Sequence, residues 1–168
     1  APVEKIRQVA HVLGIDEQGE VLAAEVRGEI DEALALAAGA VSKPRVAFVY
    51  IASDDTILLF GESTVGGGLL AAAGGHNVAV DLGIDGWVPL TPEALVAGDP
   101  EVIITASRGV ETVGGLQAFL ELPGVAETRA AVAGRVLVYE DLYLLGLSSR
   151  AGQMLREMVL DLHPELGP

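Results

Sequence analysis

The sequence predicts an α/β protein: a Rossmann-like lobe with a mainly parallel sheet flanked by helices, preceded by one long helix. From residue 45 onward, short apolar segments typical of strands alternate with helical segments, as in parallel sheets that helices cover on both faces. Before residue 40 there are only two helical segments. The composition, 51% hydrophobic and 20% charged over 168 residues, indicates one globular domain or one lobe with a substantial core.

The two N-terminal helices are predicted from apolar spacing. Residues 2–13 place apolar side chains at helical intervals, and Gly14 follows as a C-cap. A second helix, capped by Asp16, is predicted to continue to about Ala38, a length of roughly 30 Å. Gly28 is its weakest point, because glycine in a helix interior costs up to about 1 kcal/mol. The stripe predicted to be buried is Leu22, Val26, Ile30, Leu34 and Ala37.

The remaining elements follow a linker at 39–44. Residues 45–50 and 57–60 read as a strand hairpin around a turn at 53–55. Further strands are predicted at 102–105 and 135–139, and a short extended segment at 78–80. Helices are predicted at 66–73, from Pro92 after the N-cap Thr91, at 115–122, and from a Ser148 cap to about Leu162.

Composition excludes several classes of function. With 24 acidic and 10 basic residues the net charge is −14, which counts against nucleic acid and anionic membranes as partners. The absence of cysteine excludes disulfides, thiolate zinc sites and cysteine nucleophiles. His11, His76 and His163 lack metal-ligand spacing and are expected to be surface residues. No apolar stretch is long enough to span a bilayer, and no signal peptide opens the chain, which we expect to be cytosolic, processed, or part of something longer.

Motifs of α/β enzymes are missing as well. The sequence holds no G-x-G-x-x-G after a strand, no G-x-x-x-x-G-K-[ST] and no G-x-S-x-G. Arg108 and the glycines at 109, 114 and 115 come just after the strand that ends at Thr105. Ligands of open α/β sheets bind beyond the carboxyl ends of strands, so this loop is a candidate ligand contact, with a solvated surface arginine as the alternative.

Several segments together carry a resemblance to a known family. They include K-P-R-V-A-F-V-Y at 43–50, L-L-A-A-A-G-G-H-N at 69–77, W-V-P-L-T-P-E-A-L-V-A-G-D-P-E-V-I-I-T at 87–105 and R-V-L-V-Y-E-D-L-Y-L-L-G-L-S-S-R at 135–150. The chain resembles the C-terminal lobe of a haem-binding periplasmic protein of an ABC importer, in the wider group that binds siderophores and cobalamin. G-V-E-T-V-G-G at 109–115 and L-P-G-V-A-E-T at 122–128 favour the haem branch.

The resemblance implies an organisation and a function. Residues 1–15 would be the remnant of an N-terminal lobe, 16–38 the long inter-lobe helix, and 39–168 the ligand-binding lobe. We expect a protein without catalytic activity, periplasmic or on the cell surface and lipid-anchored in a full-length form, that captures haem and delivers it to an ABC permease. A ferric siderophore or cobalamin is the alternative ligand, and a Rossmann-type enzyme or regulatory domain is the alternative class.

The resemblance also implies which residues would contact the ligand. Tyr50 matches the place where some members supply a tyrosinate as the axial ligand of the haem iron, although the Tyr-x-Arg pattern is replaced here by Tyr50-Ile51-Ala52. Arg108 could then support the phenolate or meet a propionate. The alternative for Tyr50 is a strand-end tyrosine whose hydroxyl faces water. Trp87 and Tyr143 are secondary candidates for cleft contacts, more plainly explained as structural anchors.

Two partner surfaces follow from the same comparison. Members of the group dock on the permease through an acidic residue of each lobe, for which the candidates here are Glu111, Glu121 and Glu127. Without an N-terminal lobe, residues 2–13 and the long helix would expose apolar surface, so a homodimer through these helices is expected. Haem binding by this piece alone is expected to be weak, because one wall of the cleft is missing.

Overall fold

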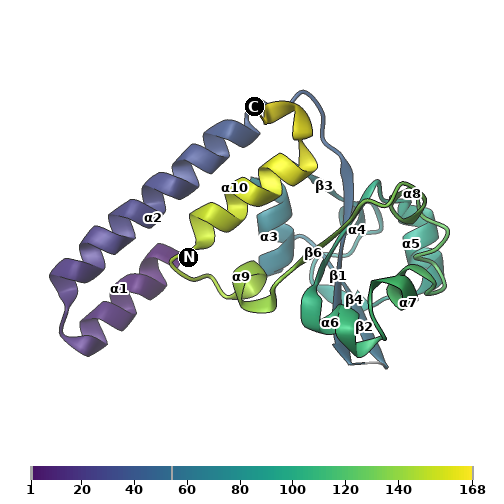
Figure 1. Ribbon diagram of the computed structural model, residues 1–168, viewed down its shortest axis with the longest axis horizontal. Helices are drawn as coiled ribbons and strands as arrows, with labels where there is room; N and C mark the ends of the chain where they lie inside the picture. The colour runs from purple at the N-terminus through teal and green to yellow at the C-terminus, as the bar shows by residue number, and fades with distance from the viewer. Residues whose placement is uncertain (1, 54, 168) are drawn as a thin grey trace.

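A helical arm and an α/β lobe make up the computed structural model, which describes residues 2–53 and 55–167 (Figure 1). The arm consists of α1 (Pro2–Leu13) and α2 (Asp16–Ala37). The two helices lie side by side and project from the lobe, where α10 (Ala151–Leu162) packs along α2. The long helix runs through Gly28 without interruption, as predicted.

The sheet has the strand order β4-β2-β1-β5-β6, with β3 paired to β1 beside this path. The pairs β1–β5, β5–β6 and β1–β3 are parallel, whereas β1–β2 and β2–β4 are antiparallel. The predicted hairpin and the mainly parallel sheet are therefore confirmed. The strands are β1 (Arg45–Ser53), β2 (Thr56–Phe60), β3 (His76–Asn77), β4 (Trp87–Pro89), β5 (Val102–Ala106) and β6 (Val136–Tyr139).

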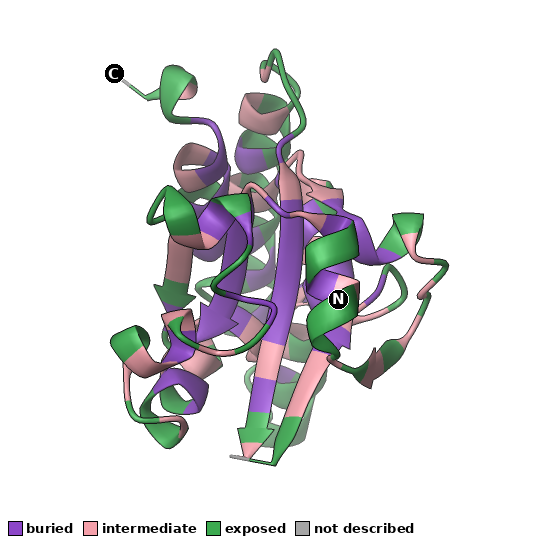
Figure 2. Cartoon of the chain, turned by 90° about the vertical axis from the view of Figure 1, so that its right-hand side faces the viewer, coloured by how far each residue is buried: buried purple, intermediate pink, exposed green. Residues whose placement is uncertain are grey.

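Helices cover both faces of this sheet and create two apolar cores. Because successive strand residues point to opposite faces, Val46 and Phe48 enter a core with α10, while Ala47 and Val49 enter a second core with Phe119. Burial along β1 decreases toward the hairpin tip (Figure 2). The remaining helices are α3 (Val65–Ala72), α4 (Val78–Asp81), α5 (Pro92–Gly98), α6 (Ser107–Thr112), α7 (Leu116–Leu120), α8 (Arg129–Val132), α9 (Asp141–Leu145) and a final 3-10 turn (Pro164–Leu166).

The buried stripe of α2 differs from the predicted one. Leu22 and Leu34 are 39% and 41% exposed. Small residues make the close contacts instead: a Cβ on Gly19 would overlap the methyl group of Ala10 in α1. The residues that α2 buries are Gly19, Ala23, Val26 and Ala33. Close approach of α1 and α10 thus selects small side chains, and the large leucines are left at the border of the contact.

Several other elements differ from the prediction in type or in bounds. Residues 78–80 are helical rather than extended, because the Asn77 side chain accepts a hydrogen bond from the Ala79 amide at 3.0 Å and starts α4. The segment that holds Arg108 is the helix α6, not a loop. The residue that precedes the last helix is Arg150 and not the predicted cap Ser148, so the helix begins at Ala151. The strand β4 was not predicted. Residue 54 of the predicted turn lies outside the described residues.

One of the three histidines contradicts its prediction. His11 is exposed and pairs with Asp16, and His76 pairs with Asp81. His163, in contrast, is fully buried, with Nε2 3.0 Å from the carbonyl oxygen of Ala73. The turn above it has a positive φ at Gly74, where a Cβ would lie 2.9 Å from that nitrogen. A glycine turn thus makes room for the imidazole, which the sequence around His163 does not reveal.

Candidate functional site

Three of the four candidate ligand contacts, Tyr50, Arg108 and Tyr143, lie toward the carboxyl edge of the parallel strands. The neighbouring strands β1, β5 and β6 lead there into the hairpin, α6 and α9. One carboxylate joins two of these connections: Oδ2 of Asp141 accepts hydrogen bonds from the Ser107 hydroxyl at 3.3 Å and from the Arg108 amide at 3.0 Å. Figure 1 shows α6 beside the β1–β2 hairpin at this edge. The edge is where open α/β sheets bind ligands.

Tyr50 lies on the part of β1 that pairs with β2, opposite Leu58. The strand continues to Ser53, so Tyr50 lies within it and not at its end. Its half-buried ring meets that of Phe60, with centroids 5.4 Å apart and planes tilted by 30°. Phe60 in turn stacks on Phe48 at 5.4 Å. Within residues 2–53 and 55–167, the Tyr50 hydroxyl makes no hydrogen bond, so its oxygen is available to a ligand.

Trp87 extends the same aromatic surface outward. It is the residue opposite Phe60 in the antiparallel β2–β4 pair, and directly opposed side chains share a face of the sheet. Trp87 as a whole is 64% exposed. We call Tyr50, Phe60 and Trp87 the aromatic face. A cavity of about 540 Å³ opens beside it, lined by Phe60, Ser63, Thr64, Val65, Gly86, Trp87 and Leu145.

Phe60 was not singled out from the sequence, although a signal for it existed. Tyr50 and Phe60 stand on opposite arms of a predicted hairpin. Along each arm, successive side chains point alternately to the two faces of the hairpin. Only the register decides whether their rings meet. The structure pairs Tyr50 with Leu58, which puts Phe60 on the same face as Tyr50, one diagonal step away.

Arg108 is the second residue of α6, and its side chain is exposed. α6 packs closely on β1: a Cβ on Gly109 would lie 3.0 Å from the carbonyl oxygen of Ile51, the residue after Tyr50. Among the described residues, the Arg108 guanidinium forms no hydrogen bond or ion pair. The structure thus brings Arg108 to the strand that bears Tyr50 and leaves its charge uncommitted.

The other two tyrosines are occupied by contacts with α10. The Tyr143 hydroxyl donates to Glu157 Oε2 at 2.9 Å, and the Arg150 guanidinium lies 4.9 Å from the ring centroid. Burial, with the Glu157 hydrogen bond, raises the pKa of Tyr143 to about 12. The Tyr139 hydroxyl donates to Asp161 at 2.6 Å, and burial raises its pKa further. Both therefore hold their protons, which disfavours the phenolate form that binds ferric iron.

The three candidate docking glutamates are all exposed but differ in their partners. Glu121 accepts a hydrogen bond from the Gln117 side chain at 2.8 Å. Glu127 accepts one from the Gly124 amide at 2.7 Å and so braces its own loop. For Glu111, on α6, the described part of the chain offers the carboxylate no hydrogen bond or ion pair. Glu111 is therefore the candidate whose charge is free for an external partner.

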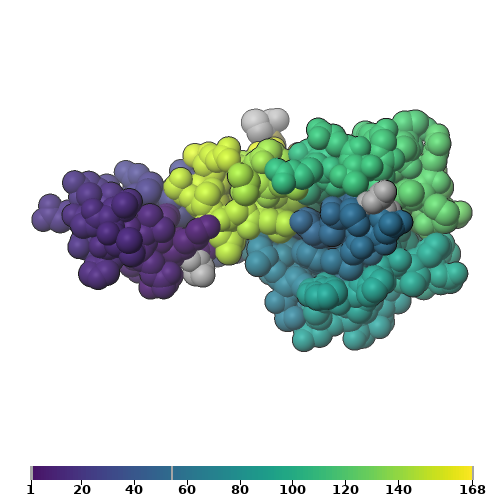
Figure 3. All heavy atoms as spheres, turned by 90° about the horizontal axis from the view of Figure 1, so that it is seen from below, coloured from purple at the N-terminus to yellow at the C-terminus, as the bar shows by residue number. Residues whose placement is uncertain are grey.

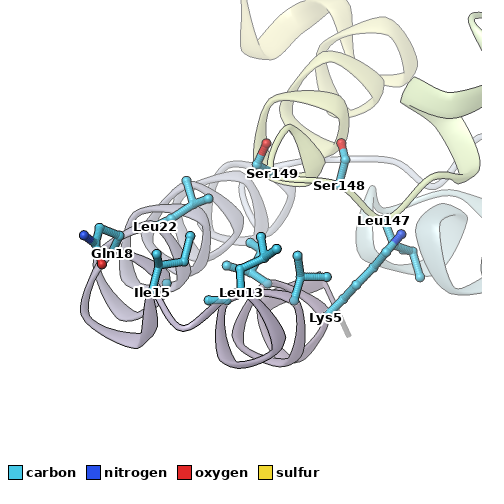
Figure 4. A pocket seen from close by; sticks show the side chains of 12 residues that line it. Lys5, Leu13, Ile15, Gln18, Leu22, Leu147, Ser148 and Ser149 are labelled. Carbon is cyan, nitrogen blue, oxygen red and sulfur yellow. The ribbon is translucent and has the colours of Figure 1, made fainter.

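A second cavity, of about 350 Å³, lies between α1, α2 and the turn before α10. Figure 4 shows side chains of all three segments around it, and Figure 3 shows how far the N-terminal helices project from the lobe. We call it the arm groove; it is lined by Lys5, Ile6, Val9, Ala10, Leu13, Ile15, Gln18, Gly19, Leu22, Leu147, Ser148 and Ser149. None of these twelve residues is acidic, although the chain carries 24 acidic residues.

No group of three or more histidine, aspartate or glutamate side chains in residues 2–53 and 55–167 is placed to hold a metal ion. In the same part of the chain, no helix combines the length and apolar character needed to cross a bilayer.

Comparison with known proteins identifies the family. Residues 3–143 match the model of the periplasmic binding proteins. The chain belongs to this family. A comparison with curated proteins gave no match. The family is one of binding proteins, in keeping with the absence of nucleotide-loop and nucleophile-elbow motifs in the sequence.

Solved structures of this family resemble the chain over almost its whole length. The periplasmic haem-binding protein RhuT from Roseiflexus sp. RS-1, in apo form, is 40% identical with a TM-score of 0.93; the match covers 99% of this chain and 63% of RhuT. The periplasmic haem-binding protein BhuT, in complex with two haems, is 30% identical with a TM-score of 0.84, covering 98% and 62%. A periplasmic haem-binding protein from Pseudomonas aeruginosa is 28% identical with a TM-score of 0.81, covering 96% and 59%. The chain thus spans about 60% of the length of these proteins.

Proposed function

We propose that this chain is the C-terminal lobe of an extracytoplasmic binding protein that captures haem and delivers it to an ABC permease. The observation that carries the proposal is the Tyr50 hydroxyl, which has no partner among the described residues and stands beside aromatic rings at the carboxyl edge of the sheet. The resemblance to RhuT and BhuT, which bind haem, supports the ligand class. The proposal includes no catalytic step.

In this proposal Tyr50 is an axial ligand of the ferric iron. A phenolate is a hard anionic oxygen donor, and coordination to iron lowers its pKa from the ordinary value of about 10. The free guanidinium of Arg108 supplies positive charge near the phenolate or meets a haem propionate. Trp87 contacts the ligand through its exposed indole. Tyr143 serves the site indirectly, because its ring and hydroxyl hold α9 against α10.

The domain organisation in this proposal follows the length comparison. Residues 1–15 belong to an N-terminal lobe, 16–38 form the inter-lobe helix, and 39–168 form the second wall of a ligand cleft. RhuT is substantially longer than this chain, so it has residues available for a further wall. The full-length protein is periplasmic or on the cell surface, held there by a lipid anchor. Haem binds one wall weakly, because its other face stays in water.

Hemin titration of the 168-residue chain, followed by the Soret absorbance, tests the proposal. We expect weak but saturable binding, and a Tyr50→Phe variant that keeps the ring should lose the tyrosinate charge-transfer band and release hemin faster. Tyr143→Phe is the matched control and should leave the band unchanged. An unchanged band and off-rate in Tyr50→Phe would refute the ligand role of Tyr50. Saturable binding of cobalamin or a ferric siderophore, but not hemin, would favour the alternative ligands.

The permease is the proposed macromolecular partner, and Glu111 is the docking residue that the geometry favours over Glu121 and Glu127. The exposed carboxylate of Glu111 makes no contact within the described residues, whereas the other two are used by their own helix or loop. A carboxylate without an internal partner pays no loss of internal contacts when it meets an arginine of a transporter.

A homodimer through the arm groove is proposed for the chain on its own. Leu13 is 64% exposed, and Val9 and Leu22 stand with it along an apolar surface without carboxylates. In a chain with net charge −14, such a surface is where two copies meet with least repulsion. Light scattering at rising concentration should show a dimer, and Leu13→Glu should return the chain to a monomer. A monomer at every concentration would count against the interface.

A further inference from the structure

We infer that Asp141 is a positioning residue: its carboxylate fixes the start of α6 and thereby the place from which the Arg108 side chain reaches a ligand. Asp141 is the first residue of α9, on the connection that follows β6. This inference rests on the proposed function and deepens it, because it assigns a role to a residue that acts on the ligand only through another one.

The pairing of β5 with β6 brings Asp141 to α6. Ala106 and Tyr139, the last residues of these two strands, are directly paired in parallel register, so both strands leave the sheet at the same level. Just beyond this pair, Asp141 Oδ2 accepts hydrogen bonds from the Ser107 hydroxyl at 3.3 Å and from the Arg108 amide at 3.0 Å. The contact therefore joins two neighbouring strand connections.

The start of α6 has no capping side chain of its own. Ala106 precedes the helix, and its methyl group accepts no hydrogen bond from the first helical amides. An N-cap side chain ordinarily accepts from the second or third amide of a helix, and Arg108 is the second residue of α6. The Asp141 carboxylate takes this place with a charge-assisted hydrogen bond at the positive end of the helix.

The backbone of Arg108 is the point from which its long side chain extends. Arg108 is exposed, and in the part of the chain that the structure describes its guanidinium has no hydrogen bond or ion pair that would hold it. Gly109 keeps the body of α6 close to β1. Loss of the Asp141 bond would free the first turn of α6, so that the Arg108 guanidinium would have to be ordered when it meets a carboxylate or a phenolate.

Amide exchange tests the contact without a ligand. Because the Arg108 amide donates to Asp141, its exchange with solvent, measured by NMR on the 168-residue chain, should become roughly tenfold faster in Asp141→Ala. Thr91→Ala is the matched control, since the Thr91 hydroxyl caps a different helix, α5, by accepting from the Ala94 amide. It should leave the Arg108 amide unchanged. Unchanged exchange in Asp141→Ala would overturn the inference.

Hemin release tests the consequence for the ligand. Asp141→Ala should speed release by up to about fivefold, and by no more than Arg108→Ala, because an exposed ion pair contributes little more than this to affinity. Asp141→Asn keeps an oxygen acceptor without the charge and should lie between the unaltered chain and Asp141→Ala. In the Arg108→Ala background, Asp141→Ala should have no further effect, because no guanidinium is left to position.

The outcomes separate positioning from general destabilisation. Unchanged release in Asp141→Ala, independent effects of the two substitutions in the double variant, or equally fast release in Thr91→Ala would each overturn the positioning role. All three would leave the proposed function standing. If the unaltered chain shows no saturable binding of hemin, the proposed function and the positioning role both fail.

Discussion

Two glycines of α2 allow the free-energy cost of disturbing the close contact between α1 and α2 to be measured. Gly19 is buried, and a Cβ there would overlap the Ala10 methyl group; Gly28 is exposed, with nothing within 4 Å of a Cβ. Gly28→Ala should therefore stabilise the protein by about 1 kcal/mol through helix propensity alone. Gly19→Ala gains the same propensity but must separate α1 from α2, and overpacking of this kind costs about 1–3 kcal/mol.

The difference between the two variants isolates the packing cost, because the propensity gain is common to both. Gly19→Ala should be less stable than Gly28→Ala by about 1–3 kcal/mol in urea denaturation followed by far-UV circular dichroism. Since Ala10 and Gly19 both line the arm groove, dimer formation should weaken in Gly19→Ala as well. Equal stability of the two variants would refute the close contact between α1 and α2.

The remaining predictions concern pH, charge and docking. The pKa of Tyr143 is raised to about 12, so its contribution to stability is complete below about pH 10 and disappears between pH 10 and 12; Tyr143→Phe should lose less stability over that range in alkaline unfolding curves. Arg108→Ala should speed hemin release in stopped-flow transfer experiments in the same direction as Tyr50→Phe but by less, and an equal or larger effect would contradict its supporting role. Glu111→Gln should weaken binding to the reconstituted permease more than Glu121→Gln, measured by surface plasmon resonance, and the reverse order would exclude Glu111.

Local patterns were sufficient for most of the fold. The strand at residues 45–50 is continuously apolar because both of its faces are buried, and the helix from Asp16 keeps its register through Gly28. The helix at Arg108 was missed because the carboxylate that accepts hydrogen bonds from the Ser107 hydroxyl and the Arg108 amide belongs to Asp141, more than thirty residues away. A capping carboxylate from a distant part of the chain cannot be recognised in the residues around the helix.

The candidate site was predicted only in part, because some of its contacts depend on strand register and on the packing of a distant helix. Tyr50, Arg108 and Trp87 were nominated from the sequence; the structure packs α6, which bears Arg108, on β1 beside Tyr50 and places Trp87 opposite Phe60 on the edge strand β4. Phe60 required the hairpin register, which turn geometry sets and composition does not. The occupied hydroxyls of Tyr143 and Tyr139 depend on where α10 packs, a tertiary contact without a local signal.

The two halves of β1 pair with different strands, and this should give their amide protons different rates of exchange with solvent. Its first half is held by β3 and β5 between two cores, whereas its second half extends as a ribbon with β2. Amide protons of Val46 to Val49 should therefore exchange with solvent only when the whole lobe unfolds, while those beyond Tyr50 exchange through local fraying. One strand thus has a slowly exchanging segment and a rapidly exchanging segment, and the boundary between them falls at Tyr50.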